Sequence, residues 1–500
     1  MIGPSAAPSD AAAAAATRPA HPARLAGGVT VITGAKVWFV LSGYALYFGL
    51  TRLLGPERFG LYSVVISIVS VLNNVLIGAS LSTVSRFVAR DPDRAGSVLR
   101  GARRVQLALG FGLSLALASA APLVGRGFRD PGLVTPLQVA AGIVFAYALY
   151  AANVGFLNGG RRFGRQAALD STFSTLKLAL VLGAVGLGLG VVGAAAGFTL
   201  AAFLILGISF FAVRGAPRGA DGFSARAYLG FGGWLVALTL VANLVLSADL
   251  WIVKRMSDPA IANQQAGLYR AAITLAQLLY QLLIPITLVV FPHLARLGDA
   301  PDPAEGRRIL RGALRYLAVT VIPGAALLGI AGPNLVALLY GAAYRGGGGW
   351  LALLGPAYAL WTGAFLVATA LAGAGRPRAG VILLGAGFAG QVIAGVAFFP
   401  LLGPAGAALG DLVGMGLGFA LGLGVVRRAF GPVMPWASVA RGVFLALLLG
   451  GVAWWWRPAG ALLVLELALL AVAGLVFLVA SGEIALPRGH RPGGAGGAAA

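Results

Sequence analysis

Long apolar segments dominate the pattern of hydrophobic and polar positions along this 500-residue chain. They recur along nearly the whole sequence, and Arg, Pro or Gly-rich breaks separate them. About 20 helical residues cross the hydrocarbon core of a bilayer, so each segment predicts a membrane-spanning helix. The breaks favour twelve to fourteen spans, and the full set is 28–50, 59–82, 104–125, 132–157, 165–187, 190–213, 228–252, 264–291, 312–331, 349–371, 379–399, 402–426, 438–455 and 459–480.

Composition agrees with this pattern. Apolar residues make up 59% of the chain and charged residues only 10%, and the mean hydropathy is +0.89. The sequence therefore predicts an all-α polytopic membrane protein whose connecting segments are too short to form a soluble domain. Cysteine is absent, which excludes disulfides, a thiol nucleophile and cysteine-ligated metal. Residues 1–27 lack the apolar core of a signal peptide and are typical of a disordered tail.

The net charge of +22 is distributed unevenly along the chain. Most of the 37 Lys and Arg residues fall in alternate loops, which is the positive-inside pattern and predicts that both termini are cytoplasmic. The basic stretch "RFVARDPDRAGSVLRGARR" (86–104) is accordingly a topology signal, and nucleic acid is not an expected partner. Contact of such loops with anionic membrane lipids follows from the same charge.

An internal repeat relates two distant helices. "FGLYSVVISIVSVLNN" (59–74) aligns with "AGLYRAAITLAQLLYQ" (266–281) at a constant offset of 207 residues. Polar residues recur at spacing i, i+4, i+7, i+11, which is one helical face: Ser63, Ser67, Ser70 and Asn74 in one copy, and Arg270, Thr274, Gln277 and Gln281 in the other. Such a face lines a wet cavity, or its hydroxyl groups bond to their own backbone and hold helices together.

The repeat divides the chain into two halves of six helices with the same topology. We expect an N-terminal lobe, a cytoplasmic linker, a C-terminal lobe, a final helix pair and a disordered tail, over residues 28–213, 214–227, 228–426, 438–480 and 481–500. Two similar bundles around a central cavity, rocking against each other, are the arrangement that transporters use for alternating access.

Several segments resemble a known family. "LTRLLGPERFGLYSVV" (50–65) resembles the corresponding region of bacterial polysaccharide flippases, the O-antigen-type transporters of the MOP exporter superfamily. "SADLWIVKRM" (247–256), "QAGLYRAA" (265–272) and "VVFPHLARL" (289–297) are similar to family segments in the second half. The resemblance is clearest over roughly 30–300.

This resemblance implies a fourteen-helix fold and the export of a lipid-linked oligosaccharide from the inner to the outer leaflet of the bacterial plasma membrane. It also implies that a polysaccharide polymerase and glycosyltransferases act in the same biosynthesis. Related branches move the peptidoglycan lipid precursor or couple drug export to cations, and both remain alternatives. A membrane-embedded glycan polymerase or ligase is the alternative from another class, but the loops carry no catalytic constellation, cofactor motif or clustered metal ligands.

A polyprenyl diphosphate needs cations within the membrane to carry its dianionic head across. Lys36, Lys177 and Arg270 lie inside predicted spans, and a charge at the bilayer centre costs at least about 2.5–3.5 kcal/mol. We therefore expect these three to bind the diphosphate, and the two polar faces to bind sugars. The structural alternative is snorkelling or an ion pair.

Acidic residues also occur inside the spans. Asp170, Asp249 and Asp411 are candidates for binding a coupling H⁺ or Na⁺, or for forming ion pairs. Asp170, Ser174 and Lys177 share one helical face at spacing i, i+4, i+7, which places Asp170 and Lys177 about 10 Å apart along the axis. Asp249 also fits an ion pair at the outer edge, close to Lys254.

Overall fold

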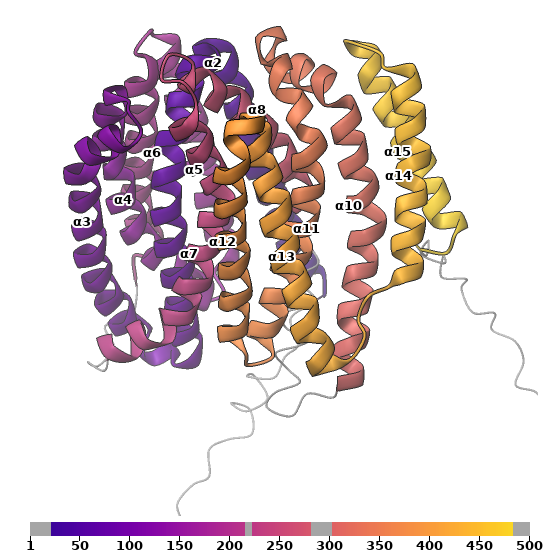
Figure 1. Cartoon of the computed structure of the whole chain (residues 1–500). Helices are drawn as coiled ribbons and strands as arrows, with labels where there is room; N and C mark the ends of the chain where they lie inside the picture. The colour runs from indigo at the N-terminus through magenta and orange to yellow at the C-terminus, as the bar shows by residue number, and fades with distance from the viewer. Residues whose placement is uncertain (1–21, 216–222, 282–302, 484–500) are drawn as a thin grey trace, which may run out of the picture.

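The protein is a bundle of long helices that run roughly side by side (Figure 1). The structure is a computed structural model that describes residues 22–215, 223–281 and 303–483, and no strand occurs among them. Each predicted span coincides with a helical segment, although 282–291 of the eighth span lies outside the described residues. The prediction of an all-α polytopic membrane protein is confirmed.

The first half of the chain contributes five helices and two short 3-10 turns. They are α2 (Pro22–Arg90), η1 (Pro92–Arg94), α3 (Ala95–Gly127), η2 (Pro131–Leu133), α4 (Val134–Gly159), α5 (Phe163–Gly186) and α6 (Gly190–Ala212). Residues 1–21 of the predicted disordered tail (1–27) and residues 216–222 of the predicted linker (214–227) lie outside the described residues.

The second half contains the remaining elements. They are α7 (Ala225–Met256), α8 (Ala262–Gln281), α10 (Pro303–Tyr340), η3 (Ala342–Trp350), α11 (Leu351–Gly373), α12 (Pro377–Leu402), α13 (Pro404–Phe430), α14 (Trp436–Trp456) and α15 (Ala461–Ala480). Within the described residues, twelve segments are long and apolar enough to cross a membrane. One of the twelve, within α2, contains two predicted spans, and α8 is not among them.

A glycine divides α2 into these two spans. Gly55 has φ 70° and ψ 172°, a conformation that a side chain disfavours, and Pro56 follows it. The rings of Tyr47 and Phe59 lie 6.0 Å apart across this break, whereas twelve residues of straight helix would separate them by about 18 Å. The chain therefore folds back at Gly55, and the "LLGPERFG" segment joins two spans in one turn.

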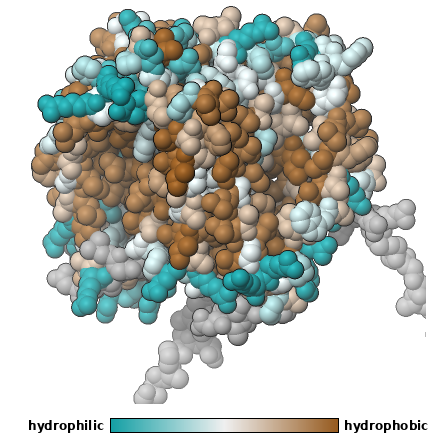
Figure 2. All heavy atoms as spheres, viewed as in Figure 1, coloured by the Kyte–Doolittle hydropathy of each residue, from teal (hydrophilic) through white to brown (hydrophobic). Residues whose placement is uncertain are grey.

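The surface carries a broad apolar belt between two polar ends (Figure 2). Large side chains on the belt are exposed, for example Leu447 at 71% and Val476 at 62%. A water-soluble surface would not expose so much apolar area, whereas a lipid-facing one requires it. This belt supports a multi-pass membrane protein.

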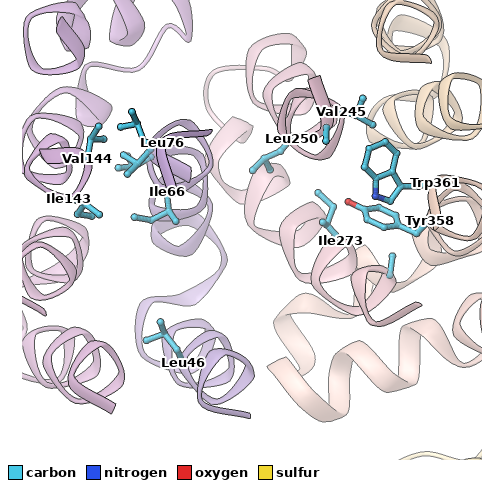
Figure 3. Packing of buried hydrophobic residues seen from close by; sticks show 14 of the residues in the cluster. Leu46, Ile66, Leu76, Ile143, Val144, Val245, Leu250, Ile273, Tyr358 and Trp361 are labelled. Atoms are coloured by element: carbon cyan, nitrogen blue, oxygen red, sulfur yellow. The ribbon is translucent and has the colours of Figure 1, made fainter. Parts of the chain in front are cut away.

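Helix α2 is the centre of the packing. Its residues contact α4 and α5 of the first half and also α7 and α8 of the second half. Figure 3 shows Ile66 and Leu76 of α2 facing Ile143 and Val144 of α4, while Leu250 and Ile273 lie with α11 residues on the other side. The two halves therefore meet along α2, α7 and α8.

The final helix pair lies at the edge of the bundle. α14 packs chiefly on α10, and α15 packs on α14 and α10 (Figure 1). A small separate cluster of buried side chains holds this edge together, comprising Val319, Leu445, Leu449, Ala453, Leu470 and Leu478. The pair is thus an addition to the bundle and not part of its centre.

Candidate functional site

The two copies of the sequence repeat touch each other at their shared glycine. Gly60 of α2 and Gly267 of α8 occupy the same repeat position, 207 residues apart. A Cβ atom on Gly60 would lie 1.8 Å from the Asn263 carbonyl oxygen, and one on Gly267 would lie 2.0 Å from the Pro56 carbonyl oxygen. Pro56 and Asn263 share the same offset. The contact is therefore locally symmetric, with two backbones in direct contact about a pseudo-twofold axis.

A buried ion pair lies beside this glycine crossing. Lys254 Nζ donates to Asp130 Oδ2 at 2.7 Å and to Asn263 Oδ1 at 2.6 Å, and Asn263 Nδ2 donates to the same Asp130 oxygen at 2.9 Å. Asp130 precedes η2 in the first half, while Lys254 ends α7 in the second. Partial burial raises the pKa of Asp130, but the hydrogen bonds and charge of Lys254 outweigh it and hold the pKa below its usual value. The network ties the two halves together at this end.

We expect Asp130→Ala to destabilise the protein by about 3 kcal/mol, because the Lys254 side chain, 1% exposed, loses its anionic partner. Thermal unfolding in detergent measures this. Since the folded pKa of Asp130 lies below its unfolded value of about 3.9, the stabilisation is present above that value and is lost as the pH falls through the folded pKa. The gap between wild type and variant should therefore narrow in acid. An equal gap at all pH values would contradict the assignment.

Two buried carboxyl groups face each other in the second half. Asp249 of α7 is 1% exposed, Asp411 of α13 is fully buried, and their side chains lie against each other. Gln391 Nε2 of α12 donates to Asp411 Oδ1 at 2.7 Å, and Leu250 N donates to Asp249 Oδ1 at 2.8 Å. Each aspartate lies about two helical turns inside the same end of the bundle.

This carboxylate pair is incompletely satisfied. The Oδ2 atoms of Asp249 and Asp411, Gln391 Oε1 and the Tyr269 hydroxyl group make no well-formed hydrogen bond within the described residues. The two carboxyl groups and the Tyr269 hydroxyl group nevertheless lie close enough to interact with one another. Two adjacent carboxylates in a low-dielectric interior do not both carry charge unless a cation joins them. The arrangement therefore has the chemistry of a proton or small-cation site. Lys254, the partner that an outer-edge ion pair would need, is bound to Asp130 instead.

Lys177 lies near the middle of α5 inside a ring of aromatic side chains. Its Nζ atom lies 5.3 Å from the ring centroid of Phe198, 5.6 Å from that of Phe173 and 5.8 Å from that of Phe39. These rings come from α6, α5 and α2. Cation–π contacts of this kind stabilise a charge without neutralising it. Among the described residues, Lys177 has no ion pair.

Arg270 joins the two halves of the bundle from α8. Its Nη2 atom donates to the Tyr47 hydroxyl oxygen of α2 at 2.9 Å, and its guanidinium lies 5.2 Å from the centroid of the same ring. Asp249 lies within the range of an electrostatic interaction with this guanidinium group. Lys177 and Arg270 therefore belong to opposite halves, each held by aromatic groups.

The other two predicted charged residues, Lys36 and Asp170, lie in the first half. Lys36 belongs to the first part of α2, and its side chain lies outside the described residues. Asp170 Oδ1 accepts a hydrogen bond of 3.3 Å from the Tyr150 hydroxyl group. The Ser174 hydroxyl group on the same face donates to the Ser171 carbonyl oxygen at 3.0 Å, so it is satisfied by its own helix.

The polar face of α2 lies at the contact with α7. Ser63 Oγ donates to its own helix, at the Phe59 carbonyl oxygen. Ser67 Oγ accepts from Trp251 Nε1 at 2.8 Å, and Asn74 Nδ2 donates to Asn243 Oδ1 at 2.6 Å. Ser70 is half-buried. This face holds helices together, and a role in sugar binding stays a prediction.

The matching face of α8 makes similar contacts. Thr274 Oγ1 donates to the Arg270 carbonyl oxygen at 2.8 Å, and Gln277 Nε2 donates to the Tyr358 hydroxyl oxygen at 3.5 Å. Gln281 is half-buried at the last described position of the helix. Of this face, only Arg270 offers a positive charge.

Sequence reasoning did not identify three features of these sites. They are the Asp130–Lys254–Asn263 network, Gln391 beside the carboxylate pair, and the aromatic ring around Lys177. The internal repeat could have indicated that Asn263 matters. Its offset of 207 residues pairs Asn263 with Pro56 of the "LLGPERFG" turn. The partners of Asp411 and Lys177 come from other helices, so no local pattern marks them.

A cavity of ≈ 730 Å³ lies away from these charges, between α10, α11 and the final helix pair. Arg345, Arg457, Asn334 and Glu466 supply its polar lining, and alanine, leucine and proline side chains supply most of the rest. None of the residues predicted to bind cargo or coupling ion lines it.

A known protein family matches the chain. The sequence profile of a family described as "Polysaccharide biosynthesis protein" matches residues 50–346. This range contains the glycine crossing, the ion pair, Lys177, Arg270 and Asp249. No curated protein matches the chain significantly.

Solved structures with a similar fold include membrane transporters. An inward-facing multidrug resistance MATE family transporter of the MOP superfamily is 18% identical, with a TM-score of 0.67, and the match covers 78% of this chain and 94% of that one. The lipid II flippase MurJ in an inward closed conformation is 14% identical, with a TM-score of 0.69 and coverage of 90% and 98%. A MOP superfamily transporter from Pyrococcus furiosus, with a binding pocket of reversed polarity, is 17% identical, with a TM-score of 0.61 and coverage of 81% and 94%.

Proposed function

Because this chain belongs to the polysaccharide biosynthesis protein family and has the fold of MOP superfamily transporters, we propose that it is a flippase. Its cargo in this proposal is a polyprenyl-diphosphate-linked oligosaccharide, which it moves from the inner to the outer leaflet. Cell-surface polysaccharide synthesis is the process it serves, together with a polysaccharide polymerase and glycosyltransferases.

Alternating access is the mechanism in this proposal. The lobes in this proposal are residues 28–213 and 228–426. The locally symmetric contact between Gly60 and Gly267 supports two equivalent lobes related by one axis. The Asp130–Lys254 pair closes the end of the bundle beside this crossing. Rocking the lobes would break that pair, part the glycines and open the outer side.

The surroundings of Lys177 are the observation that supports an anionic cargo. Three aromatic rings hold its ammonium group in the membrane, and no carboxylate among the described residues neutralises it. A charge of this kind inside the membrane costs free energy, and binding of an anion would offset that cost. Arg270 supplies a second cation from the other lobe, with the planar geometry that suits a phosphate. Lys36 completes the set in this proposal.

The carboxylate pair is the coupling site in this proposal. Asp249 and Asp411 are too deeply buried for a drug-sized cation, but a proton or Na⁺ would satisfy their two unpartnered oxygens. Asp170 is the corresponding candidate in the first lobe. Binding of the cation changes the charge near Arg270, which links ion and cargo electrostatically.

Two alternatives within the superfamily differ in cargo. The peptidoglycan lipid precursor carries the same diphosphate, so the cations do not distinguish it from an oligosaccharide. A multidrug exporter would bind cations, and Lys177, which no carboxylate among the described residues neutralises, argues against this. A glycan polymerase or ligase would need an elaborated loop outside the membrane, whereas α3–α4, α5–α6, α12–α13 and α14–α15 are joined by short connections.

The proposal is tested with purified protein in vesicles that contain a polyprenyl-diphosphate oligosaccharide. Lys177→Ala is expected to slow its translocation by about tenfold or more, because one charge-assisted contact to the diphosphate is lost. Lys177→Arg keeps the charge and should retain most of the activity. Normal translocation by a folded Lys177→Ala variant would contradict the diphosphate assignment.

A further inference from the structure

A pocket of ≈ 370 Å³ lies between α10 and α14, at the arginine-rich end of the bundle. We call it the arginine pocket, and its polar lining consists of Arg308, Arg311, Arg315, Ser438, Arg441 and Glu483. It is far along α10 from the cavity near Arg345, and it contains none of the residues assigned to the cargo or the coupling ion.

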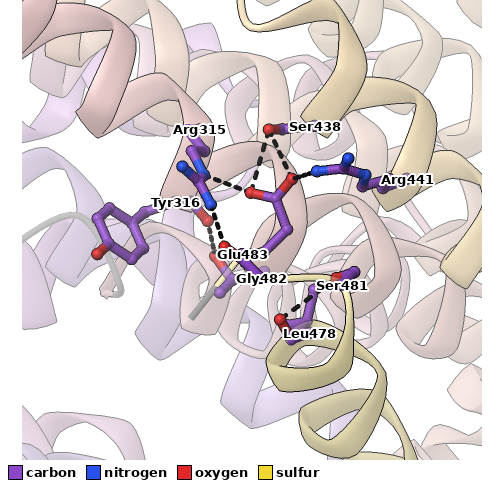
Figure 4. Close-up of polar contacts among 9 residues, drawn as sticks. Arg315, Tyr316, Ser438, Arg441, Leu478, Ser481, Gly482 and Glu483 are labelled. Atoms are coloured by element: carbon purple, nitrogen blue, oxygen red, sulfur yellow. Dashed lines mark hydrogen bonds and ion pairs between the residues drawn. The ribbon is translucent and has the colours of Figure 1, made fainter. Parts of the chain in front are cut away.

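One carboxylate already occupies part of this pocket. Glu483, just after α15, accepts hydrogen bonds from Arg315 Nε, Arg441 Nη1 and Ser438 Oγ, and its side chain is fully buried (Figure 4). Burial raises the pKa of Glu483, but the hydrogen bonds from Arg441 and Arg315 outweigh it and hold the pKa below its usual value. The inner part of the pocket therefore already binds one anionic group, the Glu483 carboxylate.

The outer part of the pocket has positive charge in excess. Arg308, Arg311 and Arg315 follow the spacing i, i+3, i+7 and lie on one face of α10. Arg308 and Arg311 are exposed and have no ion pair among the described residues. Four arginines thus surround one carboxylate, and a phosphate group would balance the excess through bidentate guanidinium contacts.

The surroundings favour a lipid as the source of this phosphate. Arg441 lies one turn before an apolar, exposed face of α14, where Phe444 is 56% and Leu447 71% exposed. A headgroup bound by the arginines would leave its acyl chains against this face. Basic pockets between helices at the cytoplasmic side are known recognition sites for anionic headgroups.

We propose that the arginine pocket binds the phosphate of an anionic membrane lipid headgroup. This phosphate would lie next to Glu483, the residue just after α15 that the inner part of the pocket binds. The lipid would link α10 to α14, the contact through which the final helix pair joins the bundle. The pocket is thus a lipid site that fixes the position of α14 and α15.

The test uses the purified full-length protein in neutral detergent and short-chain phosphatidylglycerol as the probe, with binding followed by native mass spectrometry. Arg308→Ser/Arg311→Ser removes two charges that do not contact Glu483. Arg427→Ser/Arg428→Ser is the matched control, because it removes two exposed arginines from the last turn of α13 at the same end. We expect the first variant to bind about tenfold more weakly and the control to bind like wild type.

Three other results would overturn the proposal. Equal weakening in both variants would mean that lipid binding depends on the total positive charge at this end of the protein and not on the arginine pocket. Equal binding of phosphatidylcholine would mean that the pocket does not select a headgroup by its net charge. Competition by inorganic phosphate at millimolar concentration, without binding of phosphatidylglycerol, would assign the pocket to a soluble anion. Failure of inorganic phosphate to compete, with tight lipid binding, supports the lipid as the source.

Discussion

Replacing Gly60 with alanine is expected to separate α2 from α8 and open the end of the bundle that the glycine crossing closes. The new Cβ would meet the Asn263 carbonyl oxygen at 1.8 Å, and a backbone atom cannot rotate away as a side chain does. Overpacking of this kind costs about 1–3 kcal/mol. Because roughly 1.4 kcal/mol changes an equilibrium constant tenfold, the ratio of closed to open molecules at this end should fall by about tenfold.

Cysteine labelling measures this opening directly, since the chain has no cysteine of its own. Ser63 lies one turn beyond Gly60 and is 4% exposed, so Ser63→Cys should be protected from a membrane-impermeant maleimide. In the Gly60→Ala background we expect labelling from the side on which the glycine crossing lies to be about tenfold faster. Gly267→Ala should act alike, because it occupies the equivalent position in the repeat.

Gly183 provides the matched control. It is a helical glycine of α5, and a Cβ atom there would meet nothing within 4 Å. Gly183→Ala should leave the labelling of Ser63→Cys unchanged. Labelling that is unaltered in Gly60→Ala, or raised as much by Gly183→Ala, would contradict the closing role of the crossing.

The second large effect concerns the carboxylate pair. Asp411→Asn removes the charge with almost no change in shape, so the packing around Gln391 should survive. We expect transport driven by an imposed pH or Na⁺ gradient to fall by about tenfold, because the cation loses one of its two ligands. Asp249→Asn should have the same effect. Exchange of cargo without a gradient should persist in both variants.

The comparison of gradient-driven transport with exchange separates coupling from cargo binding. Asp93→Asn is the matched control, because Asp93 lies in the exposed turn η1. It should keep the full response to the gradient. A full response in Asp411→Asn would remove the carboxylate pair from the coupling mechanism, and loss of exchange as well would indicate a structural role.

The helices were predictable because lipid imposes a simple rule on sequence. Every backbone polar group in the membrane must bond within its own helix, so apolar length alone locates a span. The predicted break at 188–189 lies just after the end of α5, whereas the predicted break at 400–401 lies within the last turn of α12, which ends at Leu402. Gly188, Gly190 and Gly403 adopt positive φ at these two helix ends. The shape of the turn at Gly55 was harder to predict, since helix continues right up to this glycine from both sides.

The candidate site was only partly predictable. The repeat related α2 to α8 and predicted two equivalent halves. Charge inside the spans marked Lys177, Arg270, Asp249 and Asp411, but it did not identify the residues around them. Helix α7 reaches α12 and α13 after more than a hundred residues of intervening chain, and spacing along one helix carries no information on such contacts. A polar stripe in the sequence can also mislead. The stripe on α2 does not reveal that the Ser63 hydroxyl group bonds to the backbone of its own helix.

The proposed function depends above all on a cargo lipid with an anionic diphosphate head. The most direct measurement loads vesicles containing only this protein with a polyprenyl-diphosphate oligosaccharide and a lipophilic cationic dye, and follows both across the membrane under one cation gradient. We expect the glycolipid to reach the opposite leaflet and the dye to stay where it was loaded. Export of the dye while the glycolipid stays in its leaflet would contradict the proposed function.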